Sequence, residues 1–330
     1  MTSFFDSLAQ LDPKNSSKTG LVAIDLFAGC GGLALGFEAA GIETIGFEQD
    51  KDAVDTYNQN LAGNCFETYL TTDTEFPNAD LVIGGPPCQP FSVGGKQLGL
   101  KDSRDGFPIF LKAVETIKPR LCLFENVRGM MYRNKDYLAE IIDQLESLGY
   151  QVSYKLVKAV NYEVPQNRER LIVIGHMGGY DFPAPFEYKF TAGDALSDIA
   201  ELVLDNHKFV TESQDKYIAK YEKASDCVNP RDLHMDRPAR TVTCRNLAGA
   251  TGDMHRIKLS DGRRKRLNVR EGARLQSFPD WFEFSGTEAS QFKQVGNAVP
   301  PLMSYHLAKG IVSYLNGEEI LTSNKQLSFL

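Results

Sequence analysis

The cysteine of a proline-rich loop is the side chain in this sequence best suited to covalent chemistry. Cys88 stands in the run GGPPCQPFS, directly after the apolar segment DLVIGG. The two prolines before it fix the backbone and remove N–H donors, which suits a side chain held in one orientation. A free thiol has a pKa of about 8.5 and is mostly protonated at neutral pH, so we expect a positive neighbour to favour the thiolate. This context favours a nucleophile over the usual role of a lone cysteine as a small buried hydrophobe.

A carboxylate and two arginines follow at the ends of later strands. Glu125 lies in the run ENV, where the next predicted strand ends, and a parallel sheet would bring it to the same edge as Cys88. A thiolate together with a carboxylic acid that can protonate or hydrogen-bond a ring nitrogen is suited to nucleophilic activation of a heterocycle. Arg168 and Arg170, in the run QNRER, are candidates for the positive neighbour. A solvated ion-pair cluster is the alternative interpretation of these arginines.

A glycine-rich turn after the first predicted strand is typical of a nucleotide-binding site. The pattern Gly29-x-Gly31-x-x-Ala34 fits the dinucleotide fingerprint, and Glu48 ends the second strand about twenty residues later. Glycines let the backbone approach a ligand closely, and a carboxylate at that place can accept hydrogen bonds from ribose hydroxyls. The pattern fits NAD and S-adenosylmethionine alike. A tight strand-to-helix turn without a ligand is the alternative.

Short apolar, β-branched runs alternate with longer amphipathic segments over residues 21–175. This is the rhythm of βαβ units, and it predicts a doubly wound α/β fold with a mostly parallel sheet. The strands of such a sheet end at one edge, where Cys88 and Glu125 would meet. Beyond the first two strands, we predict strands over 80–85, 120–126, 151–159 and 170–175, and helices near 107–117, 136–148 and 300–316.

The pattern breaks down after residue 175, where Pro, Gly, Asp, Asn and Arg separate short β-like pieces such as ARTVTC at 239–244. Asn268 stands three residues before Glu271, a capping arrangement that predicts the start of a short helix. We therefore expect a tail over residues 1–20, a catalytic and cofactor-binding domain over 21–175, a smaller irregular domain over 176–266, and a part over 267–330 that returns to the catalytic domain.

Composition places the chain among globular proteins without disulfide or metal staples. It has 330 residues, of which 42% are hydrophobic and 24% charged. The six cysteines form no C-x-x-C pair and have no histidines at zinc-ligand spacing, so we expect no metal and reduced thiols. No stretch approaches the roughly 18 apolar residues that span a bilayer, and no signal peptide is visible. We therefore expect a cytoplasmic protein with no membrane partner.

The charge of the chain is unevenly distributed. The formal net charge of −7 argues against a polyanionic partner. Between Arg231 and Arg274, however, twelve Lys and Arg residues stand against five Asp and Glu, so this segment carries +7 and the remainder −14. The segregation permits binding of a polyanion at one place.

The ordered runs IDLFAGCGG, FEQD, GGPPCQPFS, ENV, QNRER, VREGARLQSFP and GNAVP resemble the DNA (cytosine-5)-methyltransferases over residues 21–316. The resemblance implies a Rossmann-like fold of the S-adenosylmethionine-dependent methyltransferases, with 176–266 in the place of the target-recognition domain. It implies that Cys88 adds to C6 of a cytosine flipped out of double-stranded DNA, and that Glu125 holds the base at N3 and its amine. Arg168 and Arg170 would support the base and the catalytic residues.

The resemblance also implies the binding residues. Contacts to S-adenosylmethionine carry over to Phe27, Gly29, Gly31, Gly32, Glu48, Asp73 and Asn297. DNA contacts fall on Gln89, Ser92, Lys96 and Arg104 of the loop after Cys88, and in the basic segment on Arg240, Arg245, Arg256, Arg263 and Arg264. Gln49 departs from the large side chain that relatives often place against adenine. Gly94 and Gly95 leave open which side chain fills the gap left by the flipped base.

Three other functions compete with this one. An NAD-dependent oxidoreductase explains the glycine turn and Glu48, but gives no account of PPCQPFS, ENV, QNRER and GNAVP at one sheet edge. Methylation of RNA keeps the fold and the cofactor, but the Cys-Phe-Thr signature of the tRNA-directed relatives is absent. A catalytically silent DNA-binding relative is disfavoured because Cys88, Glu125 and Arg168 are present. We expect a monomeric modification enzyme of a restriction-modification system, with a possible cognate endonuclease acting on the same DNA site.

Overall fold

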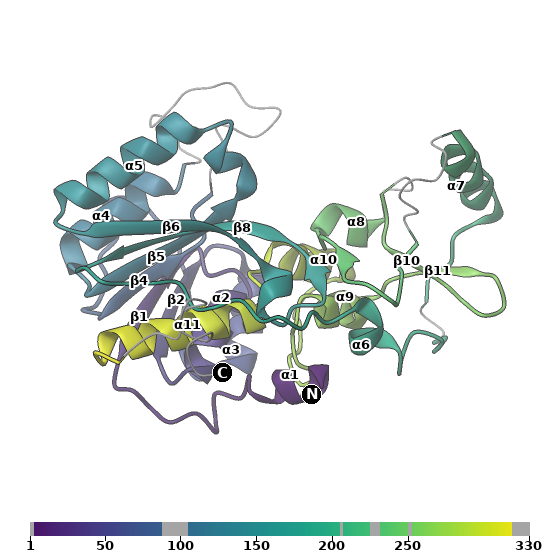
Figure 1. The fold of residues 1–330 in the computed structure, drawn as a ribbon, viewed down its shortest axis with the longest axis horizontal. Coiled ribbons are helices and arrows are strands. Elements are labelled where there is room, and N and C mark those ends of the chain that lie inside the picture. Colours follow the sequence, from purple (N-terminus) through teal and green to yellow (C-terminus); the bar gives the residue numbers. More distant parts are fainter. Residues whose placement is uncertain (1–2, 88–104, 205–206, 225–231, 250–252, 319–330) are drawn as a thin grey trace.

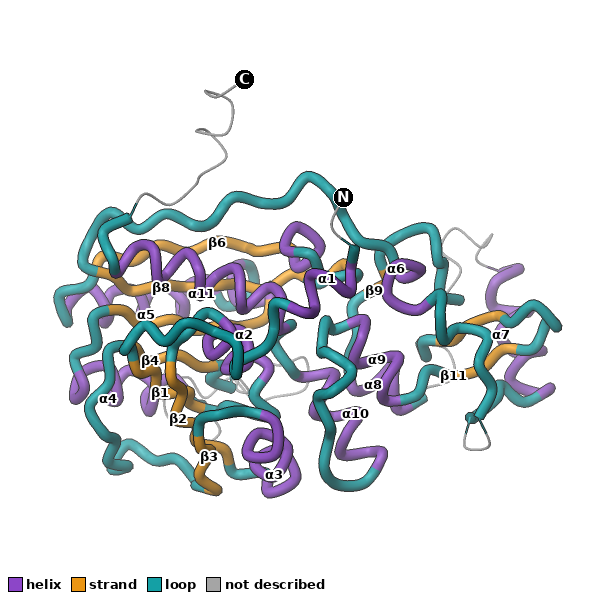
Figure 2. The backbone as a smooth tube through the Cα atoms, turned by 90° about the horizontal axis from the view of Figure 1, so that it is seen from below, coloured by secondary structure: helices purple, strands orange, loops and turns teal. Residues whose placement is uncertain are grey.

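The computed structural model describes residues 3–87, 105–204, 207–224, 232–249 and 253–318. A seven-stranded sheet with helices on both faces forms one end of the molecule (Figure 1). A smaller, irregular part with little sheet lies at the other end (Figures 1 and 2). The predicted doubly wound α/β fold with a smaller second part is confirmed.

The central sheet has the strand order β3-β2-β1-β4-β5-β8-β6, and β8 alone runs against its neighbours. The order reverses between β1 and β4, so the carboxyl ends of these strands form the switch point at which doubly wound folds bind ligands. The strands are β1 (Val22–Leu26), β2 (Glu43–Glu48), β3 (Asn64–Glu67), β4 (Leu81–Gly84), β5 (Leu121–Val127), β6 (Gln151–Lys158) and β8 (Glu169–His176).

Two helices cover one face of the sheet (Figure 1). Helix α4 (Phe107–Ile117) buries Phe107, Phe110 and Val114, which recur at the spacing of one helix face. The Phe107 ring packs edge-on against Phe124 of β5 with 5.0 Å between the ring centroids. Helix α5 (Lys135–Ser147) lies beside α4 on the same face.

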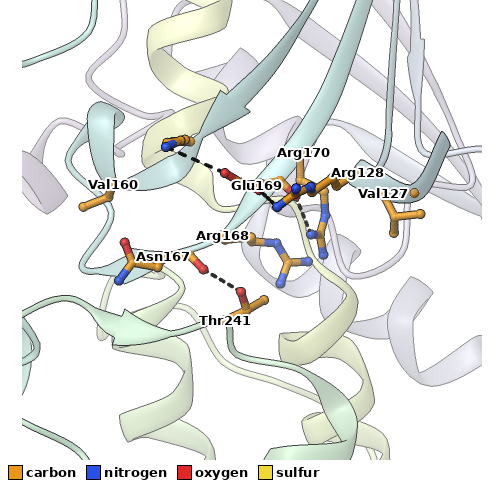
Figure 3. Close-up of a pocket in the computed structure, with 10 residues that line it drawn as sticks. Val127, Arg128, Val160, Asn167, Arg168, Glu169, Arg170 and Thr241 are labelled. Carbon is orange, nitrogen blue, oxygen red and sulfur yellow. Dashed lines mark hydrogen bonds and ion pairs between the residues drawn. The ribbon is translucent and has the colours of Figure 1, made fainter. Parts of the chain in front are cut away.

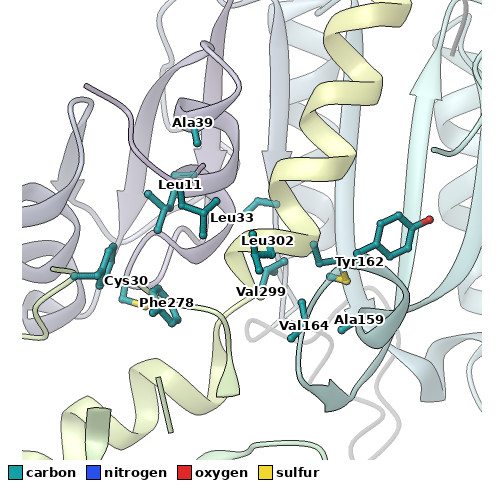
Figure 4. Packing of buried hydrophobic residues seen from close by; sticks show 14 of the residues in the cluster. Leu11, Cys30, Leu33, Ala39, Ala159, Tyr162, Val164, Phe278, Val299 and Leu302 are labelled. Carbon is teal, nitrogen blue, oxygen red and sulfur yellow. The ribbon is translucent and has the colours of Figure 1, made fainter. Parts of the chain in front are cut away.

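Three helices cover the opposite face: α2 (Gly32–Ala39), α3 (Lys51–Asn60) and α11 (Pro301–Leu315). Helices α2 and α11 touch closely at Gly36, where an added Cβ would lie 2.3 Å from the backbone nitrogen of Tyr305. Their side chains form one core with the segment before α11, as Leu33, Val299 and Leu302 show (Figure 4). This packing holds α11 and the residues before it next to the glycine turn.

The N-terminal segment contains a helix that the sequence did not indicate. Helix α1 (Phe4–Ala9) begins at a capping box in which Ser3 and Asp6 bind each other's backbone N–H groups. Phe4, Leu8 and Leu11 are buried, and α1 contacts α6. Residues 3–11 are therefore packed against the body.

The irregular part is held by short elements. They are β7 (Gln166–Asn167), α6 (Ala192–Leu196), α7 (Glu212–Ala224), β9 (Ala239–Arg240), α8 (Cys244–Ala248), β10 (Arg256–Lys258) and β11 (Arg264–Arg266). The strand predicted over 239–244 is only partly correct, because Thr243 accepts a hydrogen bond from the Asn246 N–H and starts α8. The capping box predicted at Asn268 and Glu271 is confirmed.

The segment after residue 267 divides between the two parts. Helices α9 (Val269–Leu275) and α10 (Glu288–Asn297) contact α6 and α8 of the irregular part, whereas α11 packs on α2 of the sheet part. Two short 3-10 turns, η3 (Arg128–Met131) and η4 (Ala159–Tyr162), follow β5 and β6. Within the described residues, no helix is long and apolar enough to span a membrane.

Candidate active site

An ion pair between neighbouring strands lies at the carboxyl edge of the sheet. Because β8 is antiparallel to β5, its early residue Arg170 stands opposite Val127, diagonal to Glu125 on the same face. Arg170 Nε lies 2.6 Å from Glu125 Oε1, and the two side chains are only 14% and 12% exposed. A carboxylate in this position is oriented by the guanidinium and shielded from water, which suits directed contact with a ligand.

The residues just before Cys88 are fixed beside this pair. An ideal Cβ on Gly85 would lie 3.8 Å from Glu125 Oε2. Asn126 Nδ2 donates to the Pro86 carbonyl at 3.0 Å, and the Gly106 N–H donates to the Pro87 carbonyl at 3.0 Å. Gly85 therefore lies beside Glu125, and Pro87 and Gly106, which flank the Cys88 segment, lie next to each other. Cys88 itself, with Gln89, Ser92, Lys96 and Arg104, lies outside the described residues.

A cavity of about 390 Å³ opens where the ends of β5 and β6 meet β7, β8 and the irregular part (Figure 3). Four cations line it, namely Arg128, Lys158, Arg168 and Arg170, with Glu169 as the one lining carboxylate among the described residues. Thr241 of the irregular part closes one side and donates through Oγ1 to the Asn167 carbonyl at 2.5 Å. The cavity is thus positively charged and built from both parts of the chain.

Arg168 braces the walls of the cavity. Its side chain is buried and donates to the carbonyls of Val242 at 2.8 Å, Ala298 at 3.0 Å and Gly296 at 3.3 Å. Burial, with a smaller effect of Arg170, lowers the pKa of Arg168 well below its ordinary value. These contacts give Arg168 a positioning role, in keeping with the support of the base and the catalytic residues that the resemblance implied for the two arginines.

Gln166 has a similar role that sequence reasoning missed. Its Oε1 accepts from the Val242 N–H at 2.9 Å, and its Nε2 donates to the Leu275 carbonyl at 2.7 Å and to Gln276 Oε1 at 2.6 Å. Gln166 and Arg168 together tie the start of β8 to α8, α9 and α10. The signal for Gln166 was its place in the same QNRER run.

The glycine turn adopts a conformation that its glycines make possible. Gly29 and Gly31 have φ of 55° and 86°, in the left-handed region. A Cβ on Gly31 would lie 2.6 Å from Leu61 Cδ1, and one on Gly32 would lie 2.5 Å from the Val299 carbonyl oxygen. The turn is therefore closed on its inner side by packing, so a side chain at Gly31 or Gly32 would displace the backbone.

Glu48 and Phe27 flank this turn. Glu48 Oε2 accepts from the Gly29 N–H at 3.0 Å, and Oε1 accepts from the N–H groups of Gln49 and Asp50 at 2.8 and 2.9 Å. Phe27 has φ of 58°, a strained value for an aromatic residue that is typical of functional sites. Phe27, Glu48 and the glycines of the turn therefore lie together at the switch point of the sheet.

Asn297 and Asp73 are both exposed, and both lie far from the glycine turn in the sequence. Asn297 ends α10, and the next residues reach the turn at Val299. Asp73 lies in a polar turn in which its N–H donates to Thr71 Oγ1 at 3.3 Å. Both side chains remain accessible to a ligand.

Asp25 is a buried carboxyl that sequence reasoning missed. It lies in β1 just before the turn, and neither of its oxygens has a hydrogen-bond partner among the described residues. Burial, reinforced by the charge of Glu48, raises the pKa of Asp25 well above its ordinary value. The signal was an acidic residue inside an otherwise apolar strand.

Two of the five arginines predicted to bind DNA in the basic segment are largely buried in ion pairs with carboxylates. Arg256 is only 2% exposed and is paired with Asp232 and Glu222, and Arg264 binds Asp232 at 2.9 Å and Asp215 at 2.7 Å. Buried pairs of this kind fasten α7 to β10 and β11. Their geometry therefore suits a structural role, in place of the phosphate contacts expected from the sequence.

The other three arginines predicted to bind DNA in the basic segment are more accessible. Arg263 is 56% exposed, pairs with Asp261 and lies over the Phe209 ring at 4.5 Å. Arg240 is 37% exposed beside Asp253, and Arg245 is exposed in the first turn of α8. The free positive charge of this part is thus smaller than the sequence count suggested.

Comparisons with known proteins agree with this arrangement. The model of the C-5 cytosine-specific DNA methylase family matches residues 21–313. The Type II methyltransferase M.AplI of Arthrospira platensis is 54% identical, over 88% of this chain and 85% of that protein. M.FnuDI of Fusobacterium nucleatum is 31% identical, over 90% and 95%. The solved structure of the S. pombe Dnmt2 methyltransferase shares the fold, with a TM-score of 0.67 and 18% identity over 90% of this chain and 99% of that one.

Proposed function

Because the chain belongs to the C-5 cytosine-specific DNA methylases, we propose that the cavity beside Glu125 and Arg170 receives the cytosine that this enzyme methylates. Site-specific methylation of cytosine in DNA, in the context of restriction and modification, is the activity of the family and of this chain. The observation that carries the proposed site is the Arg170 to Glu125 ion pair of 2.6 Å at the edge where β4 leads to Cys88.

We assign the nucleophile to Cys88. Its thiolate adds to C6 of the cytosine, while Glu125 in its protonated form gives its proton to N3 and accepts a hydrogen bond from the exocyclic amine, and so neutralises the negative charge that the addition places on the ring. C5 then carries the electron density that forms the new carbon–carbon bond. A base removes the C5 proton, the C6–S bond breaks, and the thiolate is restored. Arg170 holds the Glu125 carboxylate in place through these steps.

The cofactor that we assign is S-adenosylmethionine, which supplies the methyl group when it is bound. The residues of the turn fit such a ligand: Gly29 leaves open space where a Cβ would stand, and Glu48 sits where ribose hydroxyls could donate to it. Phe27, Gly31, Gly32, Asp73 and Asn297 complete the proposed site. The partnerless oxygens of Asp25 indicate that this edge of the sheet is built for a polar ligand.

Access to C5 requires that the base leave the duplex, because a stacked cytosine cannot meet Cys88 and the cofactor together. Flipping costs a few kcal/mol of stacking and pairing. The cavity is bounded by both parts of the chain, so DNA lying between them presents the flipped base to it. We assign base reading to the irregular part, with Arg240 and Arg245 as candidates and Arg263 on phosphates.

We place the enzyme in the bacterial cytoplasm as a monomer and as the modification partner of an endonuclease that cuts the same site. The curated relatives support this placement, since M.AplI and M.FnuDI are named as Type II methyltransferases of bacteria. The endonuclease would be blocked by methylation at the shared sequence.

One assay tests both the cofactor site and the activity. It uses labelled S-adenosylmethionine and long duplex DNA that includes many different short sequences. We expect label in 5-methylcytosine of the duplex, and much less in RNA of the same sequence. Glu48→Gln should raise the KM for the cofactor about tenfold or more, because hydrogen bonds to charged groups contribute about 1.5–3 kcal/mol.

Glu67→Gln is the matched control, since Glu67 stands beside Glu48 on the neighbouring strand β3 and is exposed. Its KM should equal that of the wild type. An unchanged KM in Glu48→Gln would remove Glu48 from the cofactor site, and label confined to RNA would overturn DNA as the substrate.

A further inference from the structure

Three charged side chains that line the cavity form a cluster beside Arg170, and Figure 3 labels two of them, Arg128 and Glu169. Arg128 Nη1 lies 2.8 Å from Glu169 Oε2, and Lys158 Nζ lies 3.8 Å from Glu169 Oε1. Arg128 comes from η3 after β5, Lys158 ends β6, and Glu169 starts β8 between them. We call these three residues the rim cluster.

The rim cluster has more positive charge than its own carboxylate can neutralise. Arg128 and Lys158 are each 59% exposed, whereas Glu169 is 27% exposed and is shared between them. Arg128 also lies over the Tyr132 ring at 5.1 Å, a contact that holds the guanidinium near the mouth. The rim cluster therefore carries one excess positive charge, which faces solvent beside the proposed base site. The chain as a whole has a net charge of −7.

Stability does not account for this arrangement. Exposed ion pairs contribute little to stability, because solvent screens them and two long side chains lose freedom. The walls of the cavity are held by the buried hydrogen bonds of Gln166 and Arg168. Two exposed cations on one carboxylate at the entrance of a site therefore indicate a negatively charged ligand.

We propose that Arg128 and Lys158 bind backbone phosphates of the DNA strand that carries the target cytosine, and that Glu169 occupies them until DNA arrives. The proposal rests on the proposed function, since it places the flipped base in the cavity. A flipped base rotates about its backbone, so its flanking phosphates stay outside while the base enters. The phosphates nearest to a base held by Glu125 are then at the mouth, where the rim cluster lies.

We expect the exchange of Glu169 for a phosphate to favour DNA binding. A phosphate replaces the Glu169 carboxylate on two cations that are already in position, and the released carboxylate returns to solvent. Phosphate contacts are independent of sequence, so Arg128 and Lys158 should add affinity for specific and non-specific duplexes by the same factor. Base readout stays with the irregular part.

The experiment measures binding of duplex DNA to the full chain as a function of salt. Arg128→Ala and Lys158→Ala should each lower the slope of log K against log salt by about 0.9, the value for one phosphate contact on B-DNA. Their affinities should fall by a similar factor for duplexes with and without the target sequence. Glu169→Gln should bind DNA more tightly than the wild type, most clearly at low salt.

Lys112→Ala is the matched control, because Lys112 is an exposed lysine in a pair with Glu115 on α4, away from the cavity (Figure 1). Its slope and its activity should equal those of the wild type. A second substitution, Arg128→Gln, and a melting curve for each variant identify any loss that comes from misfolding. An unchanged slope in folded Arg128 and Lys158 variants overturns the proposal, as does weaker binding by Glu169→Gln.

Glu125→Gln in the same series separates this proposal from the proposed function. If Glu125→Gln is inactive and the salt slopes of the rim variants are unchanged, the base site stands and the phosphate contacts do not. If Glu125→Gln transfers methyl groups at the wild-type rate, the base site itself is wrong.

Discussion

Replacing Glu125 with glutamine is expected to slow methyl transfer about 10²- to 10⁴-fold. The amide has nearly the shape of the carboxyl group but has no negative charge and cannot give a proton to a ring nitrogen. Glu125 is 12% exposed and is held by Arg170, which lines the cavity. The single-turnover rate on duplex DNA at saturating cofactor measures the loss.

The control for this substitution is Glu115→Gln on α4, where the carboxylate is 53% exposed and pairs only with Lys112. That variant should transfer methyl groups at the wild-type rate. Melting temperature is measured for both variants, since Glu125→Gln also leaves Arg170 without its anion. A Glu125→Gln protein that is folded and fully active would contradict the proposed base site.

Replacing Arg168 with alanine should mainly destabilise the fold. The guanidinium donates to the carbonyls of Val242, Gly296 and Ala298, and each charge-assisted bond contributes about 1.5–3 kcal/mol. The free energy of unfolding should fall by more than about 4 kcal/mol, which is a large share of the roughly 5–15 kcal/mol that stabilises a folded domain. We expect the melting temperature to fall by roughly 8 °C or more.

Arg263→Ala provides the comparison, because Arg263 is exposed and its removal should leave the melting temperature nearly unchanged. Limited proteolysis then reports where Arg168→Ala opens, and we expect the first cuts near 239–249, the segment that Arg168 and Gln166 hold. A normal melting temperature together with lost activity would show that Arg168 contacts the substrate directly and is not a brace.

Local patterns were sufficient to predict most of the sheet and the helices α4, α5 and α11 that pack on it. The apolar runs 80–85 and 120–126 became β4 and β5, and the helix near 107–117 became α4, because their burial follows from spacing alone. The short strand β3 escaped notice because NCFE is mostly exposed. The β-branched residues of 239–244 predicted a strand over the whole segment. Only Ala239 and Arg240 form one, because Thr243 is the N-cap of α8.

The site was predictable where chemistry determines residue type and place. Cys88 and Glu125 were assigned from the strand ends on which they stand, and the structure brings Gly85 and Glu125 together. The partners of Arg256 and Arg264 were not predictable, since Asp215, Glu222 and Asp232 lie 24 to 49 residues away in sequence. A count of charges along the chain cannot show which cations the fold has already neutralised.

Sequencing of 5-methylcytosine at single-base resolution tests the central claim most directly. The DNA is plasmid from a methylation-free host that expresses this protein, with Cys88→Ser expressed in parallel to comparable soluble levels. We predict methylation of one cytosine within one short sequence at nearly every occurrence, and none with Cys88→Ser. Unmodified plasmid from cells that contain soluble wild-type protein, or equal methylation with Cys88→Ser, would contradict the account.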